Sequence, residues 1–205
     1  MKLFPALNNS LADLVQSDIP LSRQEALQPL VDFIQLKIDE SENVLINFIC
    51  THNSRRSHLA QIWAQAAACF YDVPKVACYS AGTEQTAVYP LVLDTLIRAG
   101  FEVDKTTKGD NPVYHIRYGR KESPVVAFSK KLDHSLNPKT AFAAVMTCTE
   151  ADGECPYISG AEVRLPLTYE DPKLYDHTDR QQQKYFERSL QIAREMKYVF
   201  SKIKR

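Results

Sequence analysis

The chain has 205 residues, 44% of them hydrophobic, which is enough to bury a substantial core within one domain. Its 25 basic and 25 acidic side chains give a formal net charge of zero, so no overall field favours a nucleic acid or a membrane surface as a partner. Five cysteines at irregular spacing, without a secretory signal or an apolar run of the roughly 20 residues that a membrane span needs, predict a soluble protein of the reducing cytoplasm.

The first 40 residues precede the first predicted strand, and we interpret them as an N-terminal helical extension. Apolar side chains recur there at helical spacing, at Leu27, Leu30, Val31, Ile34 and Ile38. Pro29 interrupts this pattern and predicts either a kink or a later start of the helix. The segment carries no motif for chemistry, so we expect it to be a structural brace on the core or a dimer contact.

Residues 41–205 predict a single α/β domain. Four apolar runs indicate buried strands, at Val44–Ile49, Lys75–Ser80, Phe142–Thr147 and Val163–Leu167. Helical spacing follows the first run to about Tyr71, recurs from Pro90 to Ala99, and continues from Asp179 to the C-terminus. This alternation predicts a four-stranded parallel sheet with helices on both faces.

An insertion at about 108–131 interrupts the alternation of strands and helices. Its residues alternate after Asn111, turn at Gly119-Arg120 and resume as P-V-V-A-F, which predicts a β-hairpin. A hairpin that covers the predicted site would exclude protein substrates and favour a small inorganic anion.

The loop C-T-H-N-S-R-R-S, from Cys50 to Ser57, joins the first predicted strand to a predicted helix. A helix N-terminus leaves several backbone N–H groups without carbonyl partners, so a loop at this place forms a cradle for an anion. The same surroundings favour the thiolate form of Cys50, and Arg56 has two N–H groups to bind two oxygens of a phosphate or arsenate. The alternative is a buried structural cysteine beside a surface arginine.

This loop after V-L-I-N-F-I, followed downstream by Y-S-A-G-T-E, resembles the low-molecular-weight protein tyrosine phosphatase superfamily, which includes the thioredoxin-coupled arsenate reductases. The resemblance runs from about Asn43 to Asp171 and resumes in the terminal helix. It implies that Cys50 is the nucleophile and Arg56 the oxyanion clamp. The implied oxyanion-binding set is Thr51, His52, Asn53, Ser54, Arg55, Arg56 and Ser57, in which Asn53 and Ser57 shape the loop and stabilise the thiolate.

Two loop residues depart from the pattern of that superfamily. His52 stands where a glycine is usual, and it either alters the loop geometry, adds a proton donor or is simply tolerated. Arg55 stands where many relatives carry a second cysteine, and it either favours anion binding or points to solvent.

Asp171 is the candidate general acid, because a carboxylic acid near the leaving oxygen protonates it as it departs. The resemblance places an Asp-Pro general acid in the loop before the last helix, where Asp171-Pro172 lies. The alternatives are that this dipeptide only makes a turn, or that Glu170 is the acid.

Cys148 and Cys155, in M-T-C-T-E-A-D-G-E-C-P, form a candidate redox pair. A phosphatase does not need them, whereas a reductase needs thiols through which two electrons leave the protein. They resemble the cysteine pair of thioredoxin-coupled arsenate reductases, in which one cysteine attacks the nucleophile and the next resolves the disulfide. The alternatives are that Cys148 and Cys155 are incidental, or that they form half of a metal site. No second Cys/His pair at ligand spacing accompanies them, which argues against a metal.

The sequence therefore predicts reduction of arsenate to arsenite, with thioredoxin or a similar dithiol protein as reductant and with no cofactor or metal. In that scheme Cys50 attacks arsenic, Asp171 protonates the leaving hydroxide, and Cys148 and Cys155 pass the disulfide on. The first alternative is a low-molecular-weight protein tyrosine phosphatase that works through a phosphocysteine at Cys50. The second is a sensor that binds an oxyanion or responds to redox state without catalysis.

Overall fold

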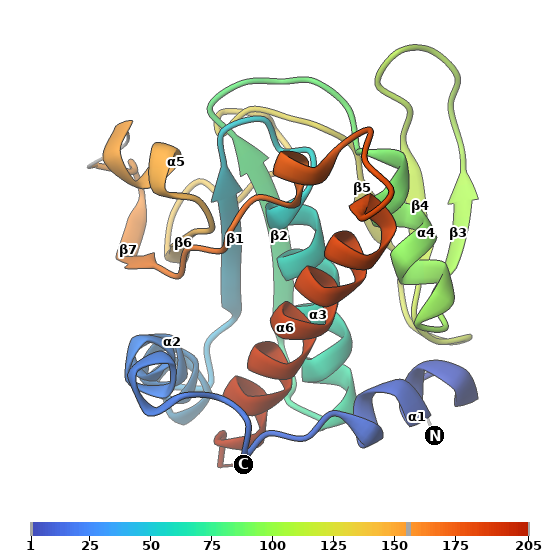
Figure 1. Cartoon of the computed structure of the whole chain (residues 1–205). Coiled ribbons are helices and arrows are strands. Elements are labelled where there is room, and N and C mark those ends of the chain that lie inside the picture. The colour runs from blue at the N-terminus through green and yellow to red at the C-terminus, as the bar shows by residue number, and fades with distance from the viewer. Residues whose placement is uncertain (1, 155–156, 205) are drawn as a thin grey trace.

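A computed structural model of the protein describes residues 2–154 and 157–204. Four strands form a parallel sheet in the order β2-β1-β6-β7 (Figure 1). They are β1 (Val44–Cys50), β2 (Val76–Gly82), β6 (Phe142–Met146) and β7 (Ala161–Pro166). The predicted α/β architecture with a four-stranded parallel sheet is confirmed.

Helices cover both faces of this sheet, as the sequence predicts. On one face α3 (Arg56–Phe70) and α6 (Gln181–Ser201) pack against each other, and the Trp63 indole N–H donates to Ser189 Oγ at 2.9 Å. On the other face the short helix α5 (Thr149–Glu154) packs against β1 and β6. A further helix, α4 (Pro90–Arg98), lies beside α6.

The N-terminal helices α1 (Pro5–Asp13) and α2 (Leu21–Asp39) belong to the same hydrophobic core as the main helices. Leu27, Leu30 and Ile34 of α2 are fully buried. The helix runs through Pro29, so the later start is wrong. Burial of apolar residues on both sides of the proline stabilises a helix that local propensity alone would break.

A small antiparallel sheet of order β3-β4-β5 lies beside α4, at the opposite side of the molecule from α5 (Figure 1). The predicted hairpin corresponds to β4 (Tyr114–Arg117) and β5 (Val125–Ala127). The third strand, β3 (Glu102–Lys105), was not predicted, because a short charged segment carries no apolar alternation.

Candidate active site

The loop after β1 turns its carbonyl groups outward. Four successive carbonyl oxygens accept hydrogen bonds from the surrounding chain, those of Thr51, His52, Asn53 and Ser54, with donors that include Glu84, Thr86, His58 and Tyr89. Among the described residues, the backbone N–H groups of residues 52–55 have no partner. With its carbonyls held from outside, the loop keeps its N–H groups available to an anion, as the cradle interpretation requires.

Cys50 lies at the bottom of this cradle and is 4% exposed. Its Sγ is 3.1 Å from Ser57 Oγ, and Asn53 Nδ2 donates to that same oxygen at 2.9 Å. The hydroxyl of Ser57 is thereby left to donate its hydrogen to the sulfur. The left-handed backbone of Asn53, with φ of 44°, brings its amide to this position.

A group of buried polar residues supports the loop from behind. His58 bonds through Nε2 to the Asn53 carbonyl at 2.9 Å and through Nδ1 to Ser80 Oγ at 3.2 Å. Burial and the charge of Lys130 lower the pKa of His58 to about 3, so the imidazole is neutral. Since a carbonyl only accepts, Nε2 carries the hydrogen.

Lys130 connects the insertion to the same loop. Its backbone N–H donates to Asn53 Oδ1 at 2.9 Å, and its Nζ lies 3.4 Å from Ser80 Oγ. Burial lowers the pKa of this lysine to about 8. His58, Ser80 and Lys130 were not predicted from the sequence, in which only Ser80 carries a signal, as part of Y-S-A-G-T-E.

Gly82 ends β2 in direct contact with the loop. A Cβ at this position would lie 2.6 Å from the Thr51 carbonyl oxygen, 2.5 Å from that of Glu84 and 2.8 Å from the Asn53 nitrogen. These are backbone atoms without freedom to move aside, so the loop conformation requires glycine here.

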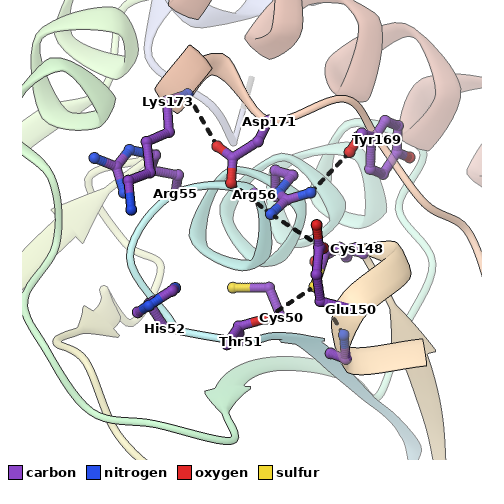
Figure 2. A network of polar contacts seen from close by, with 12 residues as sticks. Cys50, Thr51, His52, Arg55, Arg56, Cys148, Glu150, Tyr169, Asp171 and Lys173 are labelled. Atoms are coloured by element: carbon purple, nitrogen blue, oxygen red, sulfur yellow. Dashed lines mark hydrogen bonds and ion pairs between the residues drawn. The ribbon is translucent and has the colours of Figure 1, made fainter. Parts of the chain in front are cut away.

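Arg56 and Asp171 face each other across the cleft above Cys50 (Figure 2). One terminal nitrogen of the guanidinium donates to Asp171 Oδ2 at 2.5 Å, and the other donates to the Tyr169 carbonyl at 2.9 Å. The cleft is lined by Cys50, His52, Ser54, Arg55, Arg56 and Asp171. The candidate nucleophile, clamp and acid thus meet, whereas Glu170 instead pairs with Arg188 at 2.7 Å.

Arg55 points away from Cys50 (Figure 2). It pairs with Asp176 at 2.7 Å, donates to the Tyr185 hydroxyl at 2.5 Å and lies 4.1 Å from the centre of the Tyr89 ring. Its side chain is 12% exposed, so the solvent-facing alternative is wrong. His52 is different: its ring is 43% exposed at the mouth of the cleft, 3.4 Å from a carboxylate oxygen of Glu84.

Cys148 lies next to the cradle and is fully buried, in one apolar cluster with Cys50. Its Sγ is 3.5 Å from Thr51 Oγ1 and accepts the N–H of Ala151 at 3.4 Å (Figure 2). Burial raises the pKa of the Cys148 thiol, while the two hydrogen bonds act in the opposite direction. The predicted partner Cys155 lies outside the described residues.

Glu150, which the sequence analysis did not single out, lies near the cleft because α5 follows Cys148 directly. Its carboxylate is 4.0 Å from the guanidinium of Arg56. A hydrogen bond from its own backbone N–H and the charge of Arg56 lower the pKa of Glu150. The helix α5 was not predicted, because its sequence offers no apolar periodicity.

The strands of the small antiparallel sheet do not line the cleft: within the described chain, none of the residues that line it comes from β3, β4 or β5. The residues that follow β5 lie behind the loop, where Ser129 Oγ donates to the His52 carbonyl at 2.9 Å. Over residues 2–154 and 157–204, no three His, Cys, Asp or Glu side chains gather to hold a metal ion. No helix in this described part is long and apolar enough to cross a membrane.

Comparison with solved structures gives a low-molecular-weight phosphotyrosine phosphatase from Vibrio cholerae O395, with a TM-score of 0.51 and 14% identity over 78% of this chain and 95% of that chain. The chain has the fold of these phosphatases. A phosphatase of the same kind from T. tengcongensis covers 78% of this chain and 97% of its own at 15% identity, with a TM-score of 0.46. No protein-family model and no curated protein matches the sequence.

Arsenate reductases are also among the solved structures that resemble the chain. A thioredoxin-dependent arsenate reductase from Corynebacterium glutamicum matches 87% of this chain and 70% of its own, at 21% identity and a TM-score of 0.42. A shared fold does not determine an activity, so the chemistry has to be argued from the site itself.

Proposed function

We propose that the protein reduces arsenate to arsenite through the Cys50 thiolate and an intramolecular disulfide relay. The observation that carries this proposal is the position of a second thiol beside the nucleophile, since Cys148 Sγ contacts Thr51 of the anion loop at 3.5 Å. An enzyme that only hydrolyses a phosphocysteine has no step for such a thiol, whereas a reductase requires one.

The first half of the reaction uses the loop, Arg56 and Asp171. Arsenate binds to the loop N–H groups and to the guanidinium, where it displaces the carboxylate of Asp171. The side chain of Asp171, released from the guanidinium, then lies beside the bound oxyanion as the candidate proton donor. Cys50 then forms a bond from sulfur to arsenic as one As–O bond breaks, and Asp171 protonates the leaving hydroxide to water.

The second half moves two electrons. The Cys148 thiolate attacks Cys50 Sγ, so an S–S bond forms while the S–As bond breaks, and its electron pair leaves with arsenic as arsenite. Thr51 and the N–H of Ala151 stabilise the thiolate that attacks. Cys155 then attacks Cys148, which frees Cys50, and an external dithiol protein such as thioredoxin reduces the remaining disulfide.

The test is arsenate-dependent NADPH oxidation in the presence of thioredoxin and thioredoxin reductase. Wild type should turn over continuously, whereas Cys148→Ser and Cys155→Ser should each stop after about one event, because the relay lacks a thiol. Aryl-phosphate hydrolysis by the same variants is the control. Absence of arsenate turnover in wild type would contradict the proposal.

Phosphatase chemistry is the second candidate, and it is favoured by the position of Asp171, which lines the same cleft as Cys50. An acid opposite the nucleophile serves a phosphate monoester as well as arsenate, with water hydrolysing the phosphocysteine and Asp171 then acting as the base. Aryl-phosphate hydrolysis unaffected by either cysteine substitution, together with no arsenate turnover, would support this candidate.

A further inference from the structure

Glu195 of α6 is a buried carboxylate that accepts hydrogen bonds from several elements. It is 2% exposed. Arg23 of α2 binds both of its oxygens, each at 2.9 Å, and the Tyr169 hydroxyl donates at 2.8 Å. Gln191 adds a weaker bond at 3.2 Å. Because this carboxylate is buried, the loss of its cation would leave an uncompensated charge inside the protein.

Tyr169 connects this carboxylate to the cleft. The guanidinium of Arg23 lies over its ring, 4.6 Å from the centre, while burial and Glu195 raise the pKa of the hydroxyl, which therefore keeps its proton and donates. The backbone of Tyr169 is held by its N–H bond to the Thr147 carbonyl at 3.1 Å. Its own carbonyl accepts from Arg56 at 2.9 Å.

We infer that Arg23 is a positioning residue for the oxyanion clamp, and that the N-terminal extension thereby forms part of the active site. Arg23 acts through Glu195 and Tyr169 to fix the carbonyl that aims Arg56 into the cleft. The inference rests on the proposed function only in taking the loop at Cys50 as an oxyanion site.

The physical reason is preorganisation of the guanidinium. Arg56 uses one nitrogen for the Tyr169 carbonyl and so presents the other to the cleft, where Asp171 now occupies it. Removal of Arg23 leaves Glu195 buried without its cation and uncovers one side of the Tyr169 ring. Tyr169 then moves, and Arg56 must be oriented by the anion itself, which weakens binding.

If Arg23 only stabilised the fold, its removal would affect the anion site no more than the removal of another buried cation of α2. Lys37 provides this matched control. Lys37 lies on the same helix, is 4% exposed and pairs with Glu42 and Glu162 at 2.7 and 2.8 Å. It has no contact with Tyr169 or Arg56. Both Arg23→Met and Lys37→Met should lower the melting temperature, but only the first should affect the anion site.

The experiment measures how well inorganic phosphate protects Cys50 from iodoacetamide in the full-length protein. Trypsin releases Cys50 in the peptide 38–55 from wild type and the Arg23 variants, and in the peptide 24–55 from Lys37→Met. Cys50 is the only cysteine of either peptide, so mass spectrometry reports this thiol separately from the others. The readout is the phosphate concentration that halves the alkylation rate, which requires no turnover and no assumption about arsenate.

We expect Arg23→Met to raise that concentration roughly 10-fold, about the effect of one charge-assisted hydrogen bond, and Lys37→Met to leave it unchanged. Arg23→Lys, which keeps the charge but loses the two-point contact, should restore part of the protection. An unchanged concentration in Arg23→Met, or equal shifts in Arg23→Met and Lys37→Met, would overturn the inference.

If Arg23→Met folds poorly, Tyr169→Phe alone tests the same path, and it too should raise the phosphate concentration that halves the alkylation rate. It removes only the hydroxyl that reaches Glu195. If both residues act along one path, the double variant should weaken phosphate protection no more than Arg23→Met does alone; strictly additive effects would contradict the path. No protection by phosphate in wild type would refute the oxyanion site, and only that outcome bears on the proposed function.

Discussion

The neutral state of His58 fixes the direction of the hydrogen bonds behind the loop. Its Nε2–H polarises the Asn53 carbonyl, and the N–H of the same peptide group belongs to Ser54, which lines the cleft. A carbonyl that accepts a hydrogen bond makes the N–H of its peptide a stronger donor. The imidazole therefore assists anion binding from a position where no anion touches it.

The low pKa of His58, about 3, predicts how stability depends on acid. Between pH 6.5 and 3 the unfolded chain binds a proton that the folded chain does not, so the free energy of unfolding falls as pH falls. Relative to His58→Gln, which does not titrate, wild type should lose roughly 3 kcal/mol between pH 7 and pH 4. Urea unfolding at both pH values measures this difference, and parallel losses in the two proteins would disprove it.

Among the helices and strands, Arg55 connects the loop to α6. It bridges the start of α3 to Asp176, just after the 3-10 turn Pro172–Tyr175, and to Tyr185 of α6. Tyr185 in turn stacks on Tyr89, at 5.2 Å between ring centres, ahead of α4. The loop that carries Asp171 is thus held at its far end by the anion loop itself.

Loss of this bridge should cost both stability and catalysis. Arg55→Met leaves Asp176, which is 11% exposed, without its cation, and should lower the free energy of unfolding by about 3 kcal/mol. It should also lower kcat, because the Asp171 loop is then free at one end. Urea unfolding and steady-state kinetics check both effects, with Arg55→Lys as the charge-preserving control. Unchanged stability would show that the ion pair is dispensable.

Local patterns determined which elements the sequence could reveal. The strand β1, the Cys50 loop and α3 were predictable because an apolar run, a loop motif and helical spacing follow one another without a gap. Asp171, which the resemblance places in the loop before the last helix, lies opposite Arg56 in the structure. In contrast, β3 and α5 carry no such pattern, since their stability comes from packing against elements already formed.

The supporting residues of the site were beyond prediction for a further reason. Lys130 and Asn53 are 77 positions apart, and Tyr169 and Arg56 are 113 apart, so their contacts arise only when the whole chain is folded. The contacts of Arg55 also depend on residues that are distant in the sequence. Its motif position indicated a role toward anion or solvent, whereas distant aromatic and acidic residues give it a structural one.

In the molecule as a whole, the N-terminal extension contributes side chains to the hydrophobic core and does not only lie on its surface. α2 contacts β1, β7 and α6, and several of its apolar side chains are completely buried. Such a segment contributes hydrophobic free energy to the same cooperative unit as the sheet.

Leu30→Ala should therefore lower the global free energy of unfolding by roughly 2–5 kcal/mol, in a single transition. Leu21→Ala, on the same helix but at a side chain that is 70% exposed, should change it by less than about 0.5 kcal/mol. Denaturant unfolding followed by circular dichroism and by the fluorescence of Trp63 tests both. Separate transitions for the two signals would mean that the extension unfolds on its own.

Because Asp171 pairs with Arg56, the cleft contains its own counter-ion. Any incoming anion must replace a carboxylate that fits the guanidinium, so binding is an exchange and not a simple addition. Chloride has no paired oxygens for that contact and binds the cation less well than the carboxylate it would displace. The cleft should thus remain selective for tetrahedral oxyanions over halides even in concentrated salt, because every anion has to displace the carboxylate of Asp171.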